Sequence, residues 1–386
     1  MKFSVNKNSL YEAIMSASKA CALKSALNIL DGVLLNLEGN KLTITGYDLE
    51  IGIKVSLEVD GKESGKIVTD PRLLSEMVKK MPGEIINFEV LENEKSTHSM
   101  SIRITSGKSK LSLHCKNGEE FPDIIEIKKE TSFDINEKLL KEMLVRVGYA
   151  VSRVNQELEC IRMEIEDNVF YAVATDGNRL AAKHCNINNE NISFTIPDKA
   201  VSSLVRSLSD IDNSEEENKS KSSTVNISVD KNQICISKEN YVLISRLLEG
   251  KFVNYKRIIE ETFPRVLTIN TKELILSMER CLLLMSDKLK IPVNCSVEDN
   301  YMKINCRTAL GAIDEEIPVV IKEGDFTDFN INFNPRFMLE ALQKVSPDEL
   351  KEDIKISFDG ALKPFKITPV SENGEFIFII VPIRSS

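Results

Sequence analysis

The segment ATDGNRLA, residues 174–181, sets a carboxylate and a guanidinium close together. Asp176 and Arg179 follow the apolar stretch NVFYAV, which is typical of a strand and places both residues where that strand ends. A carboxylate so placed can serve as a general base, and an arginine can grip a phosphate. Asp-Gly is also ordinary chemistry for the tip of a β-hairpin. Two interpretations are therefore open, a catalytic Asp176–Arg179 pair and a hairpin tip.

Cysteine and histidine, the other residues with chemistry to offer, are scattered. The eight cysteines form no CxxC pair, and only Cys185 has a neighbouring histidine, His184. Because adjacent residues on a strand point to opposite faces, that pair is a poor metal clamp. None of the three histidines falls in a nucleophile pattern, and neither GxGxxG nor GxxxxGK[ST] occurs. We predict no catalytic residue, no metal site and no cofactor, with thiols that are free and mostly buried.

The composition indicates a globular protein of several domains. A chain of 386 residues with 42% apolar content can build two or three cores. No run approaches the roughly 18 apolar residues of a membrane helix, and Met1 leads into alternating KFSV instead of a signal peptide, so we expect a cytoplasmic protein. The net charge of -9 argues against a generally basic surface for nucleic acid, although it allows a basic face on an acidic whole.

Three segments of the chain share one design. Each opens with an Asn N-cap and continues with apolar residues at steps of three and four, beginning at Val5, Ile135 and Ile269. A second helical pattern follows in each, with Pro71, Pro197 or Pro335 at or just before its first turn. Strands of period two lie after each helix. We predict an α+β fold of three repeated domains, each ordered helix, strands, helix, strands, over residues 1–127, 128–262 and 263–386.

The repeats help to decide between the two interpretations of Asp176. The first repeat has GYDLE, with Asp48, at the corresponding strand end, and the third has RTALG, with no acid. A position that carries Asp, Asp-Gly or no acid is more typical of a turn than of a catalytic centre. We therefore predict that Asp176 is structural.

Five pieces of the chain resemble the bacterial DNA polymerase III beta subunits, the sliding clamps. They are MKFSV at the start, TGYDLEIGI at 45–53, ATDGNRLA, LEGKFVNYKRII at 248–259 and IIVPIR at 379–384. Their order and spacing span all three repeats. The resemblance implies a non-enzymatic processivity factor, a head-to-tail homodimer whose six domains form a ring around duplex DNA. In that family, helices line the hole and sheets form the outside.

The resemblance also assigns residues to the DNA and to the seam of the ring. Basic residues on the expected helices fit a bore that attracts phosphates without reading bases. The positions matched to DNA contacts are Lys24 and Lys199, and Arg72, a basic residue of an expected helix, is predicted to bind DNA with them. The positions matched to the seam are Leu111 and Leu113 from one subunit, and Leu283 and Leu284 from the other.

A hydrophobic groove for partner peptides is the third implication of the resemblance. Polymerase, clamp loader and repair proteins would bind there through short extended motifs. The matched residues are Leu158, Thr175, Gly177, Arg179, Leu180, Val253, Arg257, Ile258, Pro364, Ile379, Val381, Pro382, Ile383 and Arg384. Gly177 would allow close backbone approach, and Leu180 would floor a pocket beside Thr175 and Arg179.

Some residues depart from the family pattern around this groove. Val253 replaces a common proline, Asn178 replaces a common His or Ser, and the segment at 151–160 is shorter, so the peptide preference stays open. Two alternatives to the main replicative clamp also stay open. One is a divergent paralogue dedicated to a repair partner, and the other is an enzyme that uses Asp176 and Arg179.

Overall fold

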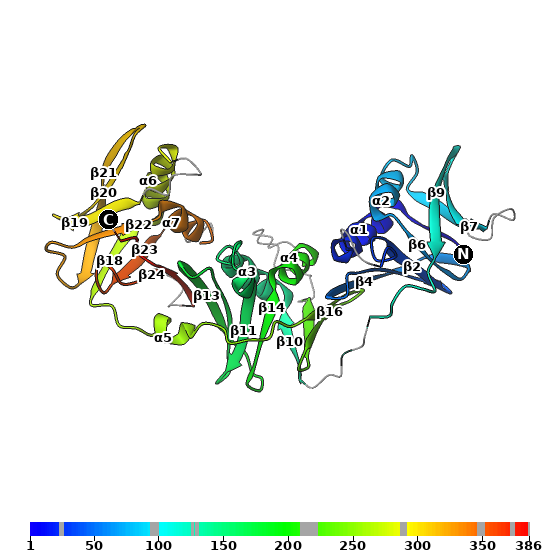
Figure 1. Ribbon diagram of the computed structural model, residues 1–386, viewed down its shortest axis with the longest axis horizontal. Coiled ribbons are helices and arrows are strands. Elements are labelled where there is room, and N and C mark those ends of the chain that lie inside the picture. The colour runs from blue at the N-terminus through cyan, green and yellow to red at the C-terminus, as the bar shows by residue number, and fades with distance from the viewer. Residues whose placement is uncertain are drawn as a thin grey trace, which may run out of the picture. The chain divides into compact units, whose positions relative to one another are not determined.

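The computed structural model falls into two compact units. It describes residues 1–22, 27–92, 100–124, 127, 131–208, 223–285, 292–345, 352–370 and 375–384. The first unit comprises residues 1–140 and 199–247, and the second comprises residues 141–198 and 248–386 (Figure 1). Each unit is built around one large antiparallel sheet.

The first helix of every repeat forms as predicted, and the predicted asparagine caps it. These helices are α1 (Lys7–Ala17), α3 (Glu137–Gly148) and α6 (Thr271–Leu283). The side chains of Asn6, Asn136 and Asn270 accept the backbone N–H groups of Ser9, Leu139 and Glu273 at 3.2, 3.1 and 3.1 Å. Each bond satisfies a donor that the first turn leaves unpaired.

The second helix of every repeat also forms. These are α2 (Pro71–Lys79), α4 (Asp198–Ser207) and α7 (Pro335–Leu342). Pro71 and Pro335 are the first helical residues, behind the N-caps Asp70 and Asn334, whereas Pro197 ends the strand before α4. A helix-opening proline loses no hydrogen bond there and already has a helical φ.

Each repeat opens with a strand, so the predicted order of elements, helix first, is wrong. The strands β1 (Lys2–Asn6), β10 (Thr131–Asn136) and β18 (Arg265–Asn270) precede α1, α3 and α6. Each has only five or six residues and runs directly into the helix cap. Too few residues alternate in such a segment for the period of two to stand out beside the helix.

The first unit holds a 13-stranded sheet. Its order is β10, β15 (Thr224–Val229), β16 (Gln233–Lys238), β17 (Tyr241–Arg246), β4 (Ile51–Glu58), β3 (Lys41–Tyr47), β2 (Val33–Glu38), β6 (Gly65–Thr69), β9 (Ser109–Asn117), β8 (Met100–Ser106), β7 (Ile85–Glu92), β1 and β5 (Asp60–Glu63). The second repeat joins the first where β17 pairs with β4, with Tyr241 opposite Val55 and Ser245 opposite Ile51. The helix α1 packs on β3 and β4.

The second unit holds a 12-stranded sheet. Its order is β14 (Ile192–Pro197), β11 (Cys160–Glu166), β12 (Val169–Thr175), β13 (Arg179–Asn186), β25 (Phe376–Ile380), β24 (Phe365–Pro369), β23 (Asp353–Phe358), β18, β21 (Gly311–Glu323), β20 (Tyr301–Thr308), β19 (Val293–Glu298) and β22 (Asn330–Phe333). The third repeat joins the second where β25 pairs with β13, with Ile380 opposite Arg179 and Ile379 opposite Leu180. The helix α6 packs on β18 and β21.

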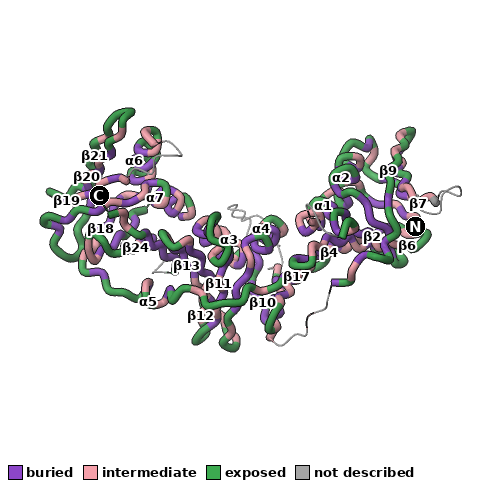
Figure 2. The backbone as a smooth tube through the Cα atoms, in the orientation of Figure 1, coloured by how far each residue is buried: buried purple, intermediate pink, exposed green. Residues whose placement is uncertain are grey.

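The division into two units runs through the second repeat because its two halves extend different sheets. Its strands β10, β15, β16 and β17 continue the sheet of the first repeat, while β14, β11, β12 and β13 continue that of the third. Buried residues follow the strands, and exposed residues mark the turns between them (Figure 2). One short helix, α5 (Tyr255–Ile259), was not predicted. It lies on the segment between the second and third repeats.

Candidate functional site

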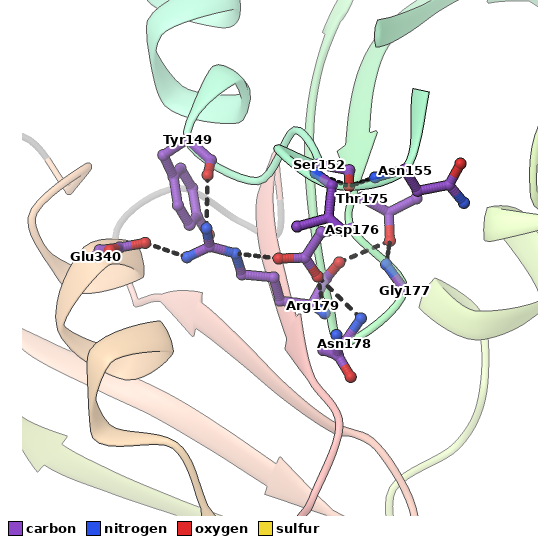
Figure 3. A network of polar contacts seen from close by, with 10 residues as sticks. Tyr149, Ser152, Asn155, Thr175, Asp176, Gly177, Asn178, Arg179 and Glu340 are labelled. Carbon is purple, nitrogen blue, oxygen red and sulfur yellow. Dashed lines mark hydrogen bonds and ion pairs between the residues drawn. The ribbon is translucent and has the colours of Figure 1, made fainter. Parts of the chain in front are cut away.

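The hairpin tip between β12 and β13 is held by its own side chains (Figure 3). Asp176 Oδ1 accepts the backbone N–H groups of Asn178 and Arg179, at 2.9 and 3.0 Å. The Thr175 hydroxyl donates to the carbonyl of Arg179 at 2.6 Å and accepts the N–H of Gly177 at 3.1 Å. Gly177 has a φ of +88°, which suits glycine. The geometry is that of an Asx-type turn, which confirms the structural role predicted for Asp176.

Arg179 is locked against the helices of the second unit. Its Nε donates to Asp176 Oδ2 at 3.0 Å, its Nη2 donates to the carbonyl of Tyr149 at 2.8 Å, and its Nη1 donates to Glu340 on α7 (Figure 3). The guanidinium also lies 5.1 Å from the ring centroid of Tyr149 and 4.7 Å from that of Phe337. Burial raises the pKa of the Tyr149 phenol, so this ring stays neutral. The side chain of Arg179 is only 11% exposed, and two carboxylates already neutralise its charge.

Arg179 and Leu180 do not share one pocket, contrary to prediction. Neighbouring residues on a strand point to opposite faces of the sheet. Arg179 therefore points to the face that carries Tyr149 and α7, whereas Leu180 points to the face covered by α5. The two residues are adjacent in the sequence, and this adjacency suggested one pocket although their side chains lie on opposite faces of the sheet.

An apolar cluster lies on the α5 face of the sheet. Its buried strand residues are Val173, Leu180, Ala182, Ile377 and Ile379, and its buried α5 residues are Tyr255 and Ile259. Tyr171, Phe252 and Ile258 pack on it and are half-buried. Three predicted groove residues, Leu180, Ile258 and Ile379, thus come together. Leu180 and Ile379 are buried under α5, so they form the base of this surface and not an open wall.

Glu164 of β11 fixes α5 over the sheet. Its carboxylate accepts the Tyr255 hydroxyl at 3.0 Å and Lys256 Nζ at 2.8 Å. Burial alone would raise the pKa of this carboxyl, but the hydrogen bonds from Lys256 and Tyr255 outweigh it, so the pKa of Glu164 lies below its ordinary value. The ionised carboxylate of Glu164 therefore binds both Tyr255 and Lys256, and these two bonds hold α5 above the cluster.

The remaining predicted groove residues lie around this cluster with different exposure. Val253, Gly177, Arg257, Val381 and Arg384 are exposed, Leu158, Pro364, Pro382 and Ile383 are half-buried, and Thr175 is buried. The C-terminal segment is tied down by its backbone: the N–H of Val381 donates to Asn178 at 2.8 Å, and the N–H of Ile383 donates to Asn332 at 2.7 Å. The exposed apolar side chains nearest to the cluster in sequence are Val253 and Val381.

The residues predicted to contact DNA differ in their surroundings. Arg72 is exposed on α2. Lys199 pairs with Asp48, and its side chain remains 50% exposed. Lys24 lies outside the described residues.

The residues predicted at the seam lie on two elements. Leu111 and Leu113 belong to β9, where Leu113 is buried and Leu111 is half-buried. Leu283 ends α6 and is 79% exposed, and Leu284 follows it, half-buried.

Several residues that shape the site were not identified from the sequence. Tyr255 could have been found, because Phe252, Tyr255 and Ile259 are spaced by three and four residues in the manner of a helix. Tyr149 and Glu340 carry no such signal. They matter only because Arg179 reaches them across the fold.

No metal or thiol chemistry competes with this site in the described part of the chain. Within that part, no group of three or more His, Cys, Asp or Glu side chains could hold a metal ion. All eight cysteines are free, and burial raises the pKa of Cys295 to about 12. No helix among the described residues is long and apolar enough to cross a membrane.

Three α+β repeats joined edge to edge through their sheets define the sliding-clamp fold. The sequence models of the DNA polymerase III beta subunit match the chain in order, with the N-terminal domain at residues 1–125, the central domain at 134–254 and the C-terminal domain at 256–384. The chain belongs to the DNA polymerase III beta subunit family. It is a sliding clamp, a processivity factor and not an enzyme.

Relatives with this name align over the full chain. The beta sliding clamp of Staphylococcus epidermidis is 26% identical over 398 residues and covers 100% of both chains. That of Streptococcus pneumoniae is 27% identical over 399 residues and covers 100% of this chain and 99% of its own. Among solved structures, the DNA polymerase III beta subunit of Thermotoga maritima superposes with a TM-score of 0.87 at 27% identity, with both chains fully covered.

Proposed function

We propose that two copies of this chain close head to tail into a ring of six repeats around duplex DNA in the cytoplasm. Helices would face the DNA and sheets would form the outer surface. The domains would be residues 1–127, 128–262 and 263–386. The observation that carries this proposal is the way in which the repeats are joined within one chain.

Both internal junctions are formed by equivalent strands of consecutive repeats. At the first, β4 of one repeat pairs with β17 of the next, and at the second, β13 pairs with β25. The strands that correspond to this pair at the ends of the chain are β21 and β9. Within the described residues, Gly311–Pro318 of β21 pair only with β20, and Ser109–Cys115 of β9 pair only with β8. Each copy thus offers one edge of each kind, and two copies can close a ring.

The internal junctions also supply a register for the junction between copies. Because Ile51 lies opposite Ser245, Gly311 would lie opposite Leu113 of a second copy. Continuing outward, Ile313 would face Leu111, and Asp314 would face Lys110.

The same correspondence supports the predicted seam leucines. Counted from the capping asparagines, Leu283 corresponds to Tyr149. Tyr149 packs against the core of the third repeat, with its ring centroid 6.5 Å from that of Phe378. In the proposed register Phe378 corresponds to Leu111. Leu283, which is exposed in one copy, would therefore pack on Leu111 of another, and burial of such side chains stabilises an interface.

DNA would be held by topology with weak phosphate contacts. The helices carry Arg72, Lys79 and Lys199, and Lys80 caps the end of α2, on a chain whose net charge is -9. We assign phosphate contacts to Lys24, Arg72 and Lys199, and the pairing of Lys199 with Asp48 lowers its share. Contacts of this kind carry no sequence information, which suits sliding.

The surface around α5 and the C-terminal segment would bind short peptides of polymerase, clamp loader and repair proteins. The buried cluster gives a rigid base, and Val253 and Val381 offer exposed apolar contacts beside it. An extended peptide with two or three apolar anchors could dock there, and each buried anchor would contribute ~1.5 to 3 kcal/mol before the cost of ordering the peptide.

Native mass tests the ring. Sedimentation equilibrium at micromolar concentration should give about twice the chain mass of 43.4 kDa. A mass of 43.4 kDa at all concentrations would contradict the closed ring.

A peptide titration tests the groove. A fluorescent peptide from the tail of the polymerase should bind the wild type and lose at least tenfold in affinity with Val253→Glu or Val381→Glu. Leu362→Glu, an exposed leucine of the same unit, is the matched control and should bind normally. We choose these positions over Leu180, because a charge at that buried residue would also damage the fold. Equal affinity of all variants would remove the groove from this surface.

A further inference from the structure

The helix α5 is too short to be stable by its own backbone bonds. It has only five residues, Tyr255–Ile259, and the side chain of its N-cap, Asn254, makes no capping hydrogen bond. Isolated helices shorter than about 12 residues are marginal in water, because nucleation fixes several residues for each bond that it forms. Contacts with the sheet must therefore hold α5 in place.

Glu164 holds the first turn of α5. Its carboxylate accepts both the Tyr255 hydroxyl and Lys256 Nζ, and only 18% of its side chain is exposed. The Lys256 amine also lies 5.7 and 5.9 Å from the ring centroids of Tyr171 and Tyr255. Charged hydrogen bonds in a partly buried place are stronger than those at the open surface. Because Glu164 lies on β11, this first anchor belongs to the second repeat.

Lys366 of β24 holds the other end of α5. Its Nζ donates to the carbonyl of Ile259, the last residue of the helix, at 3.2 Å, and lies 4.7 Å from the ring centroid of Phe263. The last carbonyls of a helix have no partner within the helix, so the lysine satisfies one of them. This second anchor belongs to the third repeat, and α5 is thus held by one charged residue from each repeat.

The anchors fix which side of α5 faces outward. Tyr255 and Ile259 are four residues apart, so they lie on one face of the helix, and both are buried against the sheet. Arg257, midway between them, lies on the opposite face and is exposed, and Ile258 is half-buried. Val253, just before the helix, is 40% exposed. A helix that lifted at either end would move Arg257 and Val253 with it.

The counterparts of the two anchors at the first junction are uncharged. Glu164 lies two residues before the glutamate that ends β11, and Asn36 has that place in β2. By the register of the strands, the residue that corresponds to Lys366 is Cys235 of β16. A pair of opposite charges is therefore found at the junction that carries α5 and not at the first one.

Apolar side chains hold the connection at the first junction instead. Ile124 is 7% exposed, and its side chain occupies the space that a Cβ atom at Gly52 would need. Gly52 has the place of Leu180, four residues after the Asp of the hairpin tip. That connection is held by burying its own side chains, whereas α5 is held by its two ends and its buried face. The charged anchors therefore leave the outer face of α5 available to a partner.

We infer that Glu164 and Lys366 are positioning residues for peptide binding, which hold the two ends of α5 so that Val253 and Arg257 face a partner peptide. This inference rests on the proposed groove and adds to it two residues that do not touch the peptide. Since one belongs to the second repeat and the other to the third, the binding surface keeps its shape only while both repeats hold α5.

Peptide affinity tests the anchors. With a fluorescent peptide from the tail of the polymerase, Glu164→Gln and Lys366→Met should each weaken binding about tenfold, because each removes a charged hydrogen bond to α5 at nearly constant side-chain volume. Lys366→Arg keeps a cation with its donors and should recover most of the affinity. The matched controls are Glu298→Gln, at an exposed glutamate that binds Lys303, and Lys355→Met, at an exposed lysine of β23, and both should bind normally.

Hydrogen exchange gives a readout at α5 itself. In Glu164→Gln and Lys366→Met, the amides of residues 255–260 should exchange faster than in the wild type, while those of β13 keep their rates. The two variants act at opposite ends of α5, so each tests the inference by itself. Weaker binding with unchanged exchange in α5 would overturn the positioning role.

Two further results separate the anchors from the groove. Wild-type affinity in both anchor variants, while Val253→Glu still loses the peptide, would overturn the anchors and leave the groove in place. A wild type that does not bind the peptide would overturn the groove itself, and the anchors with it.

Discussion

The β3–β4 and β12–β13 hairpin tips share one turn geometry, but the cations that they bind differ in burial. Asp48 accepts the N–H groups of Glu50 and Ile51 at 2.9 and 2.7 Å, as Asp176 accepts those of Asn178 and Arg179. In both tips the second carboxylate oxygen binds a cation, Lys199 at the first and Arg179 at the second. The same local chemistry therefore forms both turns.

The two cations differ in burial, and burial decides what each contact is worth. The side chain of Lys199 is 50% exposed and pairs with Asp48. The side chain of Arg179 is 11% exposed and contacts Asp176, Glu340, the Tyr149 carbonyl and two aromatic rings. Exposed pairs contribute little, whereas loss of one partner from a buried network leaves the other without compensation. The Asp-containing motif therefore predicts the turn, but it does not predict how much the cation contact stabilises the junction.

The largest expected effect is at the third junction, between copies. The double substitution Leu283→Asp with Leu284→Asp would place unpaired charges in the proposed seam, at a cost of several kcal/mol. The variant should sediment as a monomer of 43.4 kDa with unchanged far-ultraviolet circular dichroism, since Leu283 is exposed in a single copy. An undisturbed dimer would mean that the internal junctions are no guide to the seam.

Arg179→Ala should be the most damaging single change among the internal tips. It leaves Asp176 and Glu340 without their shared cation in a partly buried place, and we expect a loss of about 2 to 3 kcal/mol in the free energy of unfolding. The midpoint of urea unfolding measures it. Arg179→Lys keeps the charge but not the forked donors, so it should recover only part of the loss.

Lys199→Ala is the counterpart at the first junction and should cost at most ~1 kcal/mol, with the difference shrinking in high salt. The same urea titration, run at low and high salt, checks it. A loss as large as that of Arg179→Ala would mean that burial does not set the strength of these two contacts.

Substitutions at the second residue of each turn should give small effects of opposite sign. Leu49 holds a φ of +76° where Gly177 has +88°. Leu49→Gly should relieve steric strain that costs roughly 1 kcal/mol, offset in part by the greater freedom of an unfolded glycine, while Gly177→Ala should destabilise by about 1 kcal/mol. Thermal melting would show opposite signs for the two variants, and equal signs would contradict the equivalence of the turns.

Local patterns in the sequence predicted the parts of the fold that depend on local physics. Six helices followed from their periodicity, and the asparagine caps at residues 6, 136 and 270 followed from residue type. The turn role of Asp176 followed from comparison of the repeats. The opening strands were too short to show their period, so the predicted element order lacked them.

The candidate site was predicted less completely because its geometry depends on long-range contacts. Arg179 is directed away from Leu180 by strand alternation and by Glu340, which lies 161 residues further along the chain. The burial of Leu180 under α5 likewise depends on Glu164 holding Tyr255 and Lys256. Neither contact can be predicted from the residues that flank the ATDGNRLA motif.

Retention on DNA of different topology tests the central claim most directly. The clamp would be loaded on nicked circular DNA by its loader with ATP, and the complex would be washed with high salt before and after one restriction cut. A ring should stay on the circle through the wash and leave once the DNA is linear, because topology and not phosphate attraction holds it. Equal retention on circular and linear DNA, or release of both by salt, would contradict the account.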